Sequence, residues 1–167
     1  MIPISTPIND TLIRELAIGD KIEISGFIIT GRDAALSKLV SLINKGTLKK
    51  AGIDLLGSVI FHTAVSPAGV GPTSSNKAEI ENSIIVLSKS GVKVHLGKGS
   101  LNKTTIDGLQ KYNSVYAVIP PVTALLTSKI KQKRLIAFPE EGMEAMHLLE
   151  VESFPAIVAV AQGGSIY

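Results

Sequence analysis

The sequence contains no cysteine and no tryptophan, and only 4% of its 167 residues are aromatic. Without cysteine the chain cannot form a disulfide, use a thiolate nucleophile or supply thiolates to an iron–sulfur cluster. Nucleic-acid binders concentrate basic charge and interleave aromatic residues for base stacking. The longest basic cluster here, KIKQKR at residues 129–134, has no aromatic residue. We therefore interpret it as a solvated helix end and expect no nucleic-acid partner.

Long apolar runs are also missing, although 45% of the residues are hydrophobic. The longest uninterrupted apolar segments are far shorter than a membrane-spanning helix. The first ten residues, MIPISTPIND, lack the basic segment followed by an apolar run that marks a signal peptide. These absences predict a cytoplasmic protein without a membrane partner. The length suits one domain spanning residues 1–167.

Hydrophobic periodicity predicts an alternation of strands and helices. Leu36, Leu39 and Ile43 recur at helical spacing, whereas Ile22 and Ile24 alternate with polar residues as in a half-buried strand. The expected strands cover residues 21–29, 58–62, 92–96, 114–119 and 135–138, with two more on either side of Pro155. Extra strands at both ends favour a layered α/β domain with a mixed sheet over a regular doubly wound fold.

Three polar loops each follow an expected strand and precede an expected helix. They are ITGRDAA at residues 29–35, GPTSSNK at residues 71–77 and GKGS at residues 97–100. Ligands of open α/β sheets bind at this edge, and helix N-termini offer free N–H groups and positive potential to anions. Ordinary turns and helix caps are the alternative interpretation, and each loop taken alone fits it.

The side chains in these loops suit a small, multiply charged anion such as a dicarboxylate. Arg32, Lys77 and Lys98 contribute one cation to each loop, and Thr73 and Ser74 contribute hydroxyl groups. Charge-assisted hydrogen bonds from such groups are the usual means of holding carboxylates.

The three histidines, His62, His95 and His147, lie far apart in the sequence and lack the spacing of metal ligands. We expect them to be structural and expect no metal ligand in this chain. His62 has the stronger claim to a role, because it ends a predicted strand before the hydroxyl-rich loop.

Five segments occur in a recognisable order along the chain. They are GDKIEISGFIITGRDAA (19–35), GPTSS (71–75), VHLGKG (94–99), LEVESFPAIVAVA (149–161) and GGSIY (163–167). Taken together they resemble the β subunit of two-subunit class I fumarate hydratases, a family that includes L-tartrate dehydratase β subunits and the C-terminal domain of single-chain enzymes. The resemblance runs nearly from end to end.

The resemblance implies a β/β/α "swivelling" domain and a role in the reversible hydration of fumarate to L-malate, or of a related dicarboxylate such as tartrate. It also implies a hetero-oligomer, in which an α subunit holds an oxygen-sensitive [4Fe–4S] cluster and this chain binds no cofactor alone. By position, Arg32 would clamp a carboxylate, Lys77 would face one and Lys98 would supply a point charge. Thr73 would be the acid/base candidate, with Ser74 beside it.

Three positions depart from the family pattern around this site. Leu36 stands where the family usually has a histidine, Lys77 stands near a usual arginine, and Pro121-Val122 replaces paired glycines. Lysine keeps the charge but loses the bidentate fork of arginine. A non-catalytic anion-binding or assembly paralogue of the same fold therefore remains the alternative hypothesis.

Overall fold

The computed structural model describes the backbone of residues 1–66, 69–70, 77–120 and 123–167, and the side chains of residues 1–66, 81–120 and 124–167. Its main strands are β1 (Ile2–Ser5), β2 (Lys21–Gly31), β3 (Val59–His62), β6 (Val94–Gly97), β7 (Val115–Val118), β8 (Ile130–Ala137), β9 (Met146–Ala161) and β10 (Gly164–Ser165). Its helices are α1 (Asp10–Glu15), α2 (Asp33–Asn44), α3 (Lys77–Lys89), α4 (Lys103–Lys111) and α5 (Thr123–Ser128). A small hairpin pairs β4 (Val65–Ser66) with β5 (Gly69–Val70), and 3₁₀ helices cover Lys49–Ala51 and Pro139–Glu144.

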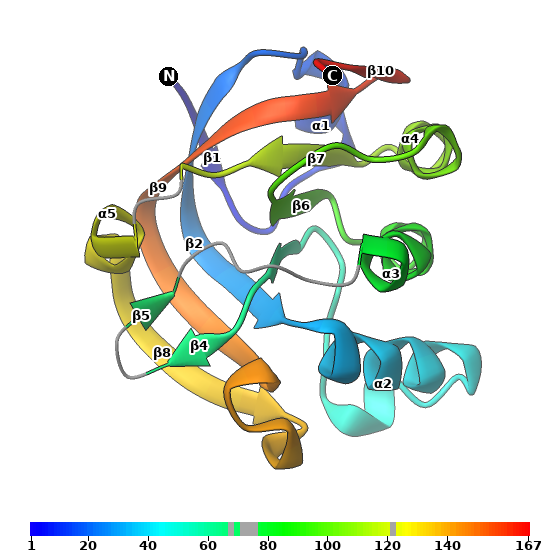
Figure 1. Ribbon diagram of the computed structural model, residues 1–167, viewed down its shortest axis with the longest axis vertical. Coiled ribbons are helices and arrows are strands. Elements are labelled where there is room, and N and C mark those ends of the chain that lie inside the picture. Colours follow the sequence, from blue (N-terminus) through cyan, green and yellow to red (C-terminus); the bar gives the residue numbers. More distant parts are fainter. Residues whose placement is uncertain (67–68, 71–76, 121–122) are drawn as a thin grey trace.

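The main sheet closes on itself through β9. Strands β2, β3, β6 and β7 lie side by side in that order, and each is parallel to the next. β9 runs antiparallel to both β7 and β2, and so joins the two ends of that series. Figure 1 shows β9 passing from one side of the sheet to the other. The predicted α/β class with a mixed sheet is confirmed.

Proline does not divide β9, contrary to the expectation of two separate strands. Pro155 pairs with Glu23 inside one continuous strand. The Val158 N–H donates to the Asp20 carbonyl, next to β2. Because successive residues of a strand direct their N–H groups to opposite edges, the nitrogen of Pro155, three residues earlier, faces away from β2. There Pro155 lies between the β8 and β7 pairings, where the missing N–H removes no ladder hydrogen bond.

Most of the basic cluster at residues 129–134 is also not a helix end. Lys129 directly follows α5, but residues 130–134 lie in β8, an edge strand that pairs with β9 alone among the described strands. Lys131, Lys133 and Arg134 are exposed there, and Lys131 forms an ion pair with Glu152 at 3.0 Å. Charged residues on an edge strand discourage pairing with other chains.

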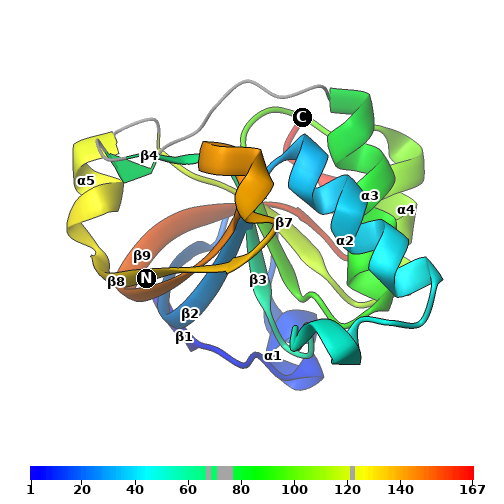
Figure 2. The same cartoon turned by 90° about the horizontal axis from the view of Figure 1, so that it is seen from below.

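The core has a layer inside the closed sheet and a layer beneath the helices. Alternation along each strand sends one set of side chains inward and the other outward. Phe61 meets Phe154 inside the sheet, edge to face at 5.7 Å between ring centroids. Outside it, Ile60 packs with Leu39 and Leu87 of the helices. Figure 2 shows α2, α3 and α4 together on that side, as in a β/β/α layering.

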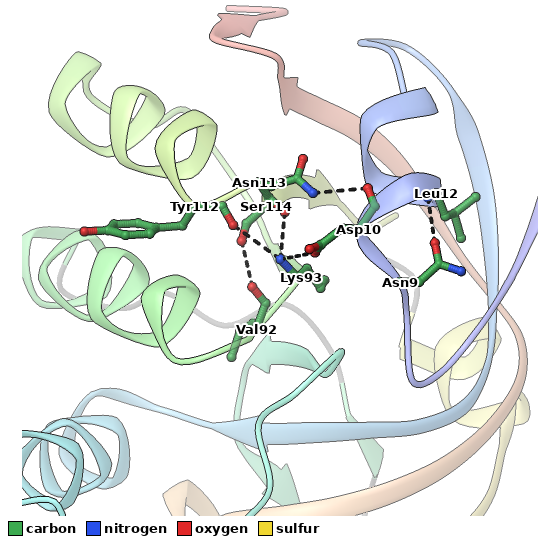
Figure 3. Close-up of polar contacts among 8 residues, drawn as sticks. All are labelled: Asn9, Asp10, Leu12, Val92, Lys93, Tyr112, Asn113 and Ser114. Atoms are coloured by element: carbon green, nitrogen blue, oxygen red, sulfur yellow. Dashed lines mark hydrogen bonds and ion pairs between the residues drawn. The ribbon is translucent and has the colours of Figure 1, made fainter.

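A half-buried lysine fastens the end of the molecule opposite the polar loops (Figure 3). Lys93 Nζ lies 2.6 Å from Asp10 Oδ1 and donates to the backbone carbonyls of Tyr112 and Asn113 at 3.3 Å. The Asn113 amide in turn donates to the Asp10 carbonyl. These contacts join α1 to the start of β6 and to the turn between α4 and β7.

Replacing Lys93 by Met should lower the free energy of unfolding by about 1–2 kcal/mol, because two carbonyls and a carboxylate lose their donor. Urea denaturation would measure the loss. Lys103→Met is the matched control, since Lys103 is 88% exposed and lies 3.7 Å from Asp107; it should change stability by less than about 0.5 kcal/mol. Equal losses in the two variants would contradict the assigned role of Lys93.

The same contact predicts a pH dependence. Its hydrogen bond to Lys93 holds the pKa of the Asp10 carboxyl below its ordinary value of 3.8. A lowered pKa stabilises the fold fully above the unfolded pKa, and this stabilisation is lost as pH falls through the folded pKa. The difference in stability between wild type and Lys93→Met should therefore shrink below about pH 4. A difference that stays constant down to pH 2 would rule out the ion pair as its source.

Candidate active site

The carboxyl ends of β2, β3 and β6 form one edge of the sheet. Gly31 pairs with His62, and Phe61 pairs with Leu96, so residues 32, 63 and 98 follow one another across that edge. Neighbouring strands lie about 4.8 Å apart, which separates the backbones at Arg32 and Lys98 by about 10 Å. The structure thus brings two of the predicted cations to the same edge, with Thr63 between them.

Arg32 occupies the N-cap position of α2. Its backbone is extended, and its side chain does not cap the helix. The first N–H groups of α2 are therefore not used by the Arg32 side chain, and the helix dipole adds positive potential beside the guanidinium. The side chain is partly exposed. A planar guanidinium at a helix N-terminus is suited to a carboxylate.

Lys98 stands on a loop that two buried groups anchor. The Tyr116 hydroxyl donates to the Lys98 carbonyl at 2.8 Å. The Glu81 carboxylate accepts from the Asn102 backbone N–H at 2.5 Å and from the Asn102 amide at 2.8 Å. Burial raises the pKa of Tyr116 well above its ordinary value, so its hydroxyl remains a donor at physiological pH. The loop backbone is thus fixed while the Lys98 side chain is exposed.

Gly97 is required by this anchoring. A Cβ at Gly97 would lie 2.9 Å from the Tyr116 hydroxyl oxygen, which is closer than such contacts normally allow. The glycine of the GKG segment therefore lets Tyr116 reach the next carbonyl. The need for glycine here is steric rather than conformational.

Three buried polar side chains form a chain beneath the same edge. His62 Nε2 lies 3.1 Å from His95 Nδ1, and His95 Nε2 lies 2.8 Å from Ser88 Oγ. Burial lowers the pKa of His62 to about 4 and lowers that of His95 as well, so both rings are neutral near pH 7. Both histidines are buried, as expected for structural residues, but their contact with each other was not predicted.

Most of the GPTSSNK loop, residues 71–76, lies outside the described residues. Thr73 and Ser74 lie outside the described residues. Lys77 is the first residue of α3, but its side chain is not described. The roles of Thr73, Ser74 and Lys77 therefore stay predictions.

Several residues of this edge were missed from the sequence. Thr63 gave no signal beyond following a strand, and Tyr116 was predicted only as part of the strand over residues 114–119. Ser88 and His95 lie seven residues apart on a helix and a strand, and His62 and His95 lie 33 residues apart. A polar residue alternating with apolar ones on two predicted strands was the available signal for the histidine pair.

The residues that the structure describes do not form a metal centre, and the chain has no thiolates for an iron–sulfur cluster. The sequence has no cysteine, and within the described ranges no group of three or more His, Asp or Glu side chains could hold a metal ion. Within the same ranges no helix has the length and apolar character needed to cross a membrane.

The fold and this edge define an α/β domain with cationic loops at the carboxyl ends of parallel strands. The family described as "Fumarase C-terminus" matches residues 1–167. The chain belongs to this family.

Curated relatives with hydratase and dehydratase names are similar along most of the chain. The anaerobic class I fumarate hydratase of Escherichia coli is 29% identical over 98% of this chain and 31% of its own length. The fumarate hydratase 2 of Leishmania major is 28% identical over 89% of the chain and 27% of its own length. The L(+)-tartrate dehydratase subunit beta of E. coli is 28% identical over 97% of the chain and 84% of its own length. The chain thus spans about a third or less of the two fumarate hydratases.

Removing the Tyr116 hydroxyl should loosen the Lys98 loop. In Tyr116→Phe, the Lys98 carbonyl loses a donor with a net contribution of about 1 kcal/mol, so amide exchange at residues 97–102 should accelerate about fivefold. Hydrogen exchange read by mass spectrometry would measure this. Tyr112→Phe is the control and should leave those amides unchanged. Equal exchange in wild type and Tyr116→Phe would show that the loop is held by other contacts.

Proposed function

We propose that this chain is the β subunit of a two-subunit iron–sulfur hydro-lyase that interconverts L-malate and fumarate or a related dicarboxylate pair such as that of tartrate. In this proposal residues 1–167 act as one domain in the cytoplasm. An α subunit holds the [4Fe–4S] cluster, which supplies Lewis-acid chemistry at the substrate hydroxyl. The observation that carries the proposal is the family match over residues 1–167. The similarity to relatives named hydratase and dehydratase supports it.

The geometry of the sheet edge supports the proposal. A four-carbon dicarboxylate has a charge at each end. The backbones at Arg32 and Lys98 are separated by about 10 Å, and both side chains are long and flexible. Arg32 would hold one carboxylate through two parallel hydrogen bonds. Lys98 would act as a point charge at the other, where negative charge grows as the neighbouring carbon loses its proton.

The remaining roles rest on the sequence. Dehydration removes a proton from one carbon and the hydroxyl from its neighbour, which leaves fumarate and water. Thr73 is the proposed acid/base residue for that proton, and Ser74 is the proposed hydrogen-bonding neighbour. Lys77 would face a carboxylate from the start of α3.

A partner follows from the chemistry of the chain. A cluster of this kind is held by thiolates, and this chain has none to offer. The proposal therefore places the cluster on the α subunit and expects no turnover from the purified chain alone.

The proposal is tested by following fumarate formation from L-malate in the ultraviolet, without oxygen, with the chain co-purified with its α partner and reconstituted cluster. Arg32→Lys should raise KM at least tenfold, because lysine keeps the charge but loses the paired hydrogen bonds. Arg32→Gln should raise KM further, because it also loses the positive charge. Arg134→Gln, an exposed change on β8, is the control and should behave as wild type.

Two outcomes would contradict parts of this proposal. Turnover by the purified chain without a partner would exclude the division of labour between subunits. A cluster-loaded complex that is inactive on malate, tartrate and methylated dicarboxylates would favour the alternative, a non-catalytic anion-binding or assembly paralogue.

The lysine at position 77 separates a weakened enzyme from that paralogue. Lys77→Arg restores the bidentate fork that the family pattern has nearby. A large gain in kcat/KM is expected if the complex is an enzyme. An inert complex that stays inert in Lys77→Arg would support the paralogue.

A further inference from the structure

The buried chain of His62, His95 and Ser88 has no part in the function proposed above. It lies between the sheet and α3, because His62 and His95 alternate with the inward residues Phe61 and Leu96. The three residues are at most 3% exposed. Buried polar groups without purpose are costly, so a chain of three in the helix-facing core calls for an explanation.

One end of this chain is unsatisfied. His62 Nδ1 is buried and finds no hydrogen-bond partner among the residues that the structure describes. Leaving such an atom without a partner costs about 1–3 kcal/mol. Buried unsatisfied polar atoms are few in native structures and often wait for a water, an ion or a ligand.

The place of His62 in the sheet relates the unsatisfied atom to the candidate site. His62 is the last residue of β3 and pairs with Gly31, the residue before Arg32. His62 turns Nε2 to His95, and the two ring nitrogens of imidazole point to different sides of the ring. Nδ1 is thus the nitrogen left for a further partner, on a residue at the same edge as Arg32 and Lys98.

The hydrogen bonds that link Ser88, His95 and His62 can run in either of two directions. In one, the Ser88 hydroxyl donates to His95 Nε2, His95 Nδ1–H donates to His62 Nε2, and His62 Nδ1 carries a proton. In the other, every donor is reversed and His62 Nδ1 carries a lone pair. Both rings are neutral in either state, so the choice between them moves no net charge. An anion at the edge would favour the first state.

We propose that His62 is a neutral hydrogen-bond donor of the anion site, and that Ser88 and His95 hold the tautomer with the proton on Nδ1 when a dicarboxylate is bound. The inference rests on the proposed function, because it needs an anion at the edge formed by Arg32 and Lys98. His62 would fix the orientation of the ligand without adding a further positive charge to the site.

Two substitutions of His62 separate its nitrogens. Asparagine places its amide nitrogen near the position of Nδ1, and glutamine places a polar group near the position of Nε2. If Nδ1 serves the ligand, His62→Gln should bind L-malate about tenfold more weakly, and His62→Asn should stay within about threefold of wild type. Calorimetric titration of L-malate into the complex of this chain with its cluster-loaded α partner would measure this.

Substitution of Ser88 tests the other end of the hydrogen-bonded series formed by His62, His95 and Ser88. Ser88→Ala removes the hydroxyl that donates to His95 Nε2 in the donor state, and should weaken L-malate binding about threefold. Ser90→Ala is the matched control, because Ser90 Oγ donates to the Val86 carbonyl and is not part of the chain. Equal binding by the two serine variants would remove Ser88 from the proposal.

A measurement on the unaltered chain covers the case in which a His62 variant does not fold. Nitrogen-15 NMR of the imidazoles reports which ring nitrogen carries the proton. Saturation with L-malate should leave His62 Nδ1 protonated and Nε2 bare. Nε2 protonated in the saturated chain, or unchanged affinity in His62→Gln, would overturn the proposal.

Arg32→Gln distinguishes failure of this inference from failure of the proposed function. If Arg32→Gln binds L-malate weakly while His62→Gln binds it normally, the anion site stands and the role of His62 falls. If wild type itself shows neither binding nor any change at His62, the anion site falls and the inference falls with it.

Discussion

The pairing of β9 with strands on both of its sides is the constraint on which the rest of this structure depends. Its 16 residues run antiparallel to β2 and β7 and also carry the edge strand β8. Without β9 the parallel strands would form an open sheet, and the apolar residues of its inner face would lack the cover that Phe154 and its neighbours provide. Closure also fixes the edge at which Arg32 and Lys98 stand.

Much of the fold could be predicted because period and punctuation agree over most of the chain. The helical spacing within α2 was predicted, and the strands β3, β6 and β7 were expected within two residues of their observed bounds. The errors have physical causes. Pro155 looks like a strand breaker, but it is harmless where no neighbour needs its N–H. Lys131 and Lys133 look like a solvated helix end, and the long pairing with β9 overrides that local preference.

The candidate site was predictable in part. Loops that follow strands and begin helices lie at one edge in any parallel sheet, so Arg32 and Lys98 could be brought together from chain order alone. The supports of the site could not. Tyr116 reaches Lys98 across a strand boundary, and His62 meets His95 over a separation that sequence periodicity does not encode. Such contacts depend on register and on rotamers, which are fixed only once the sheet has closed.

The closure by β9 also has a consequence for the order in which the molecule can be built. His147 of β9 reaches Thr30 of β2, 117 positions earlier in the chain. A nascent chain must therefore emerge through β9 before the sheet can close, and until then β2 exposes one whole edge. Long-range pairings of this kind slow folding and leave strand edges open to other chains. During synthesis, β2 and β7 thus keep one edge unpaired until β9 has emerged.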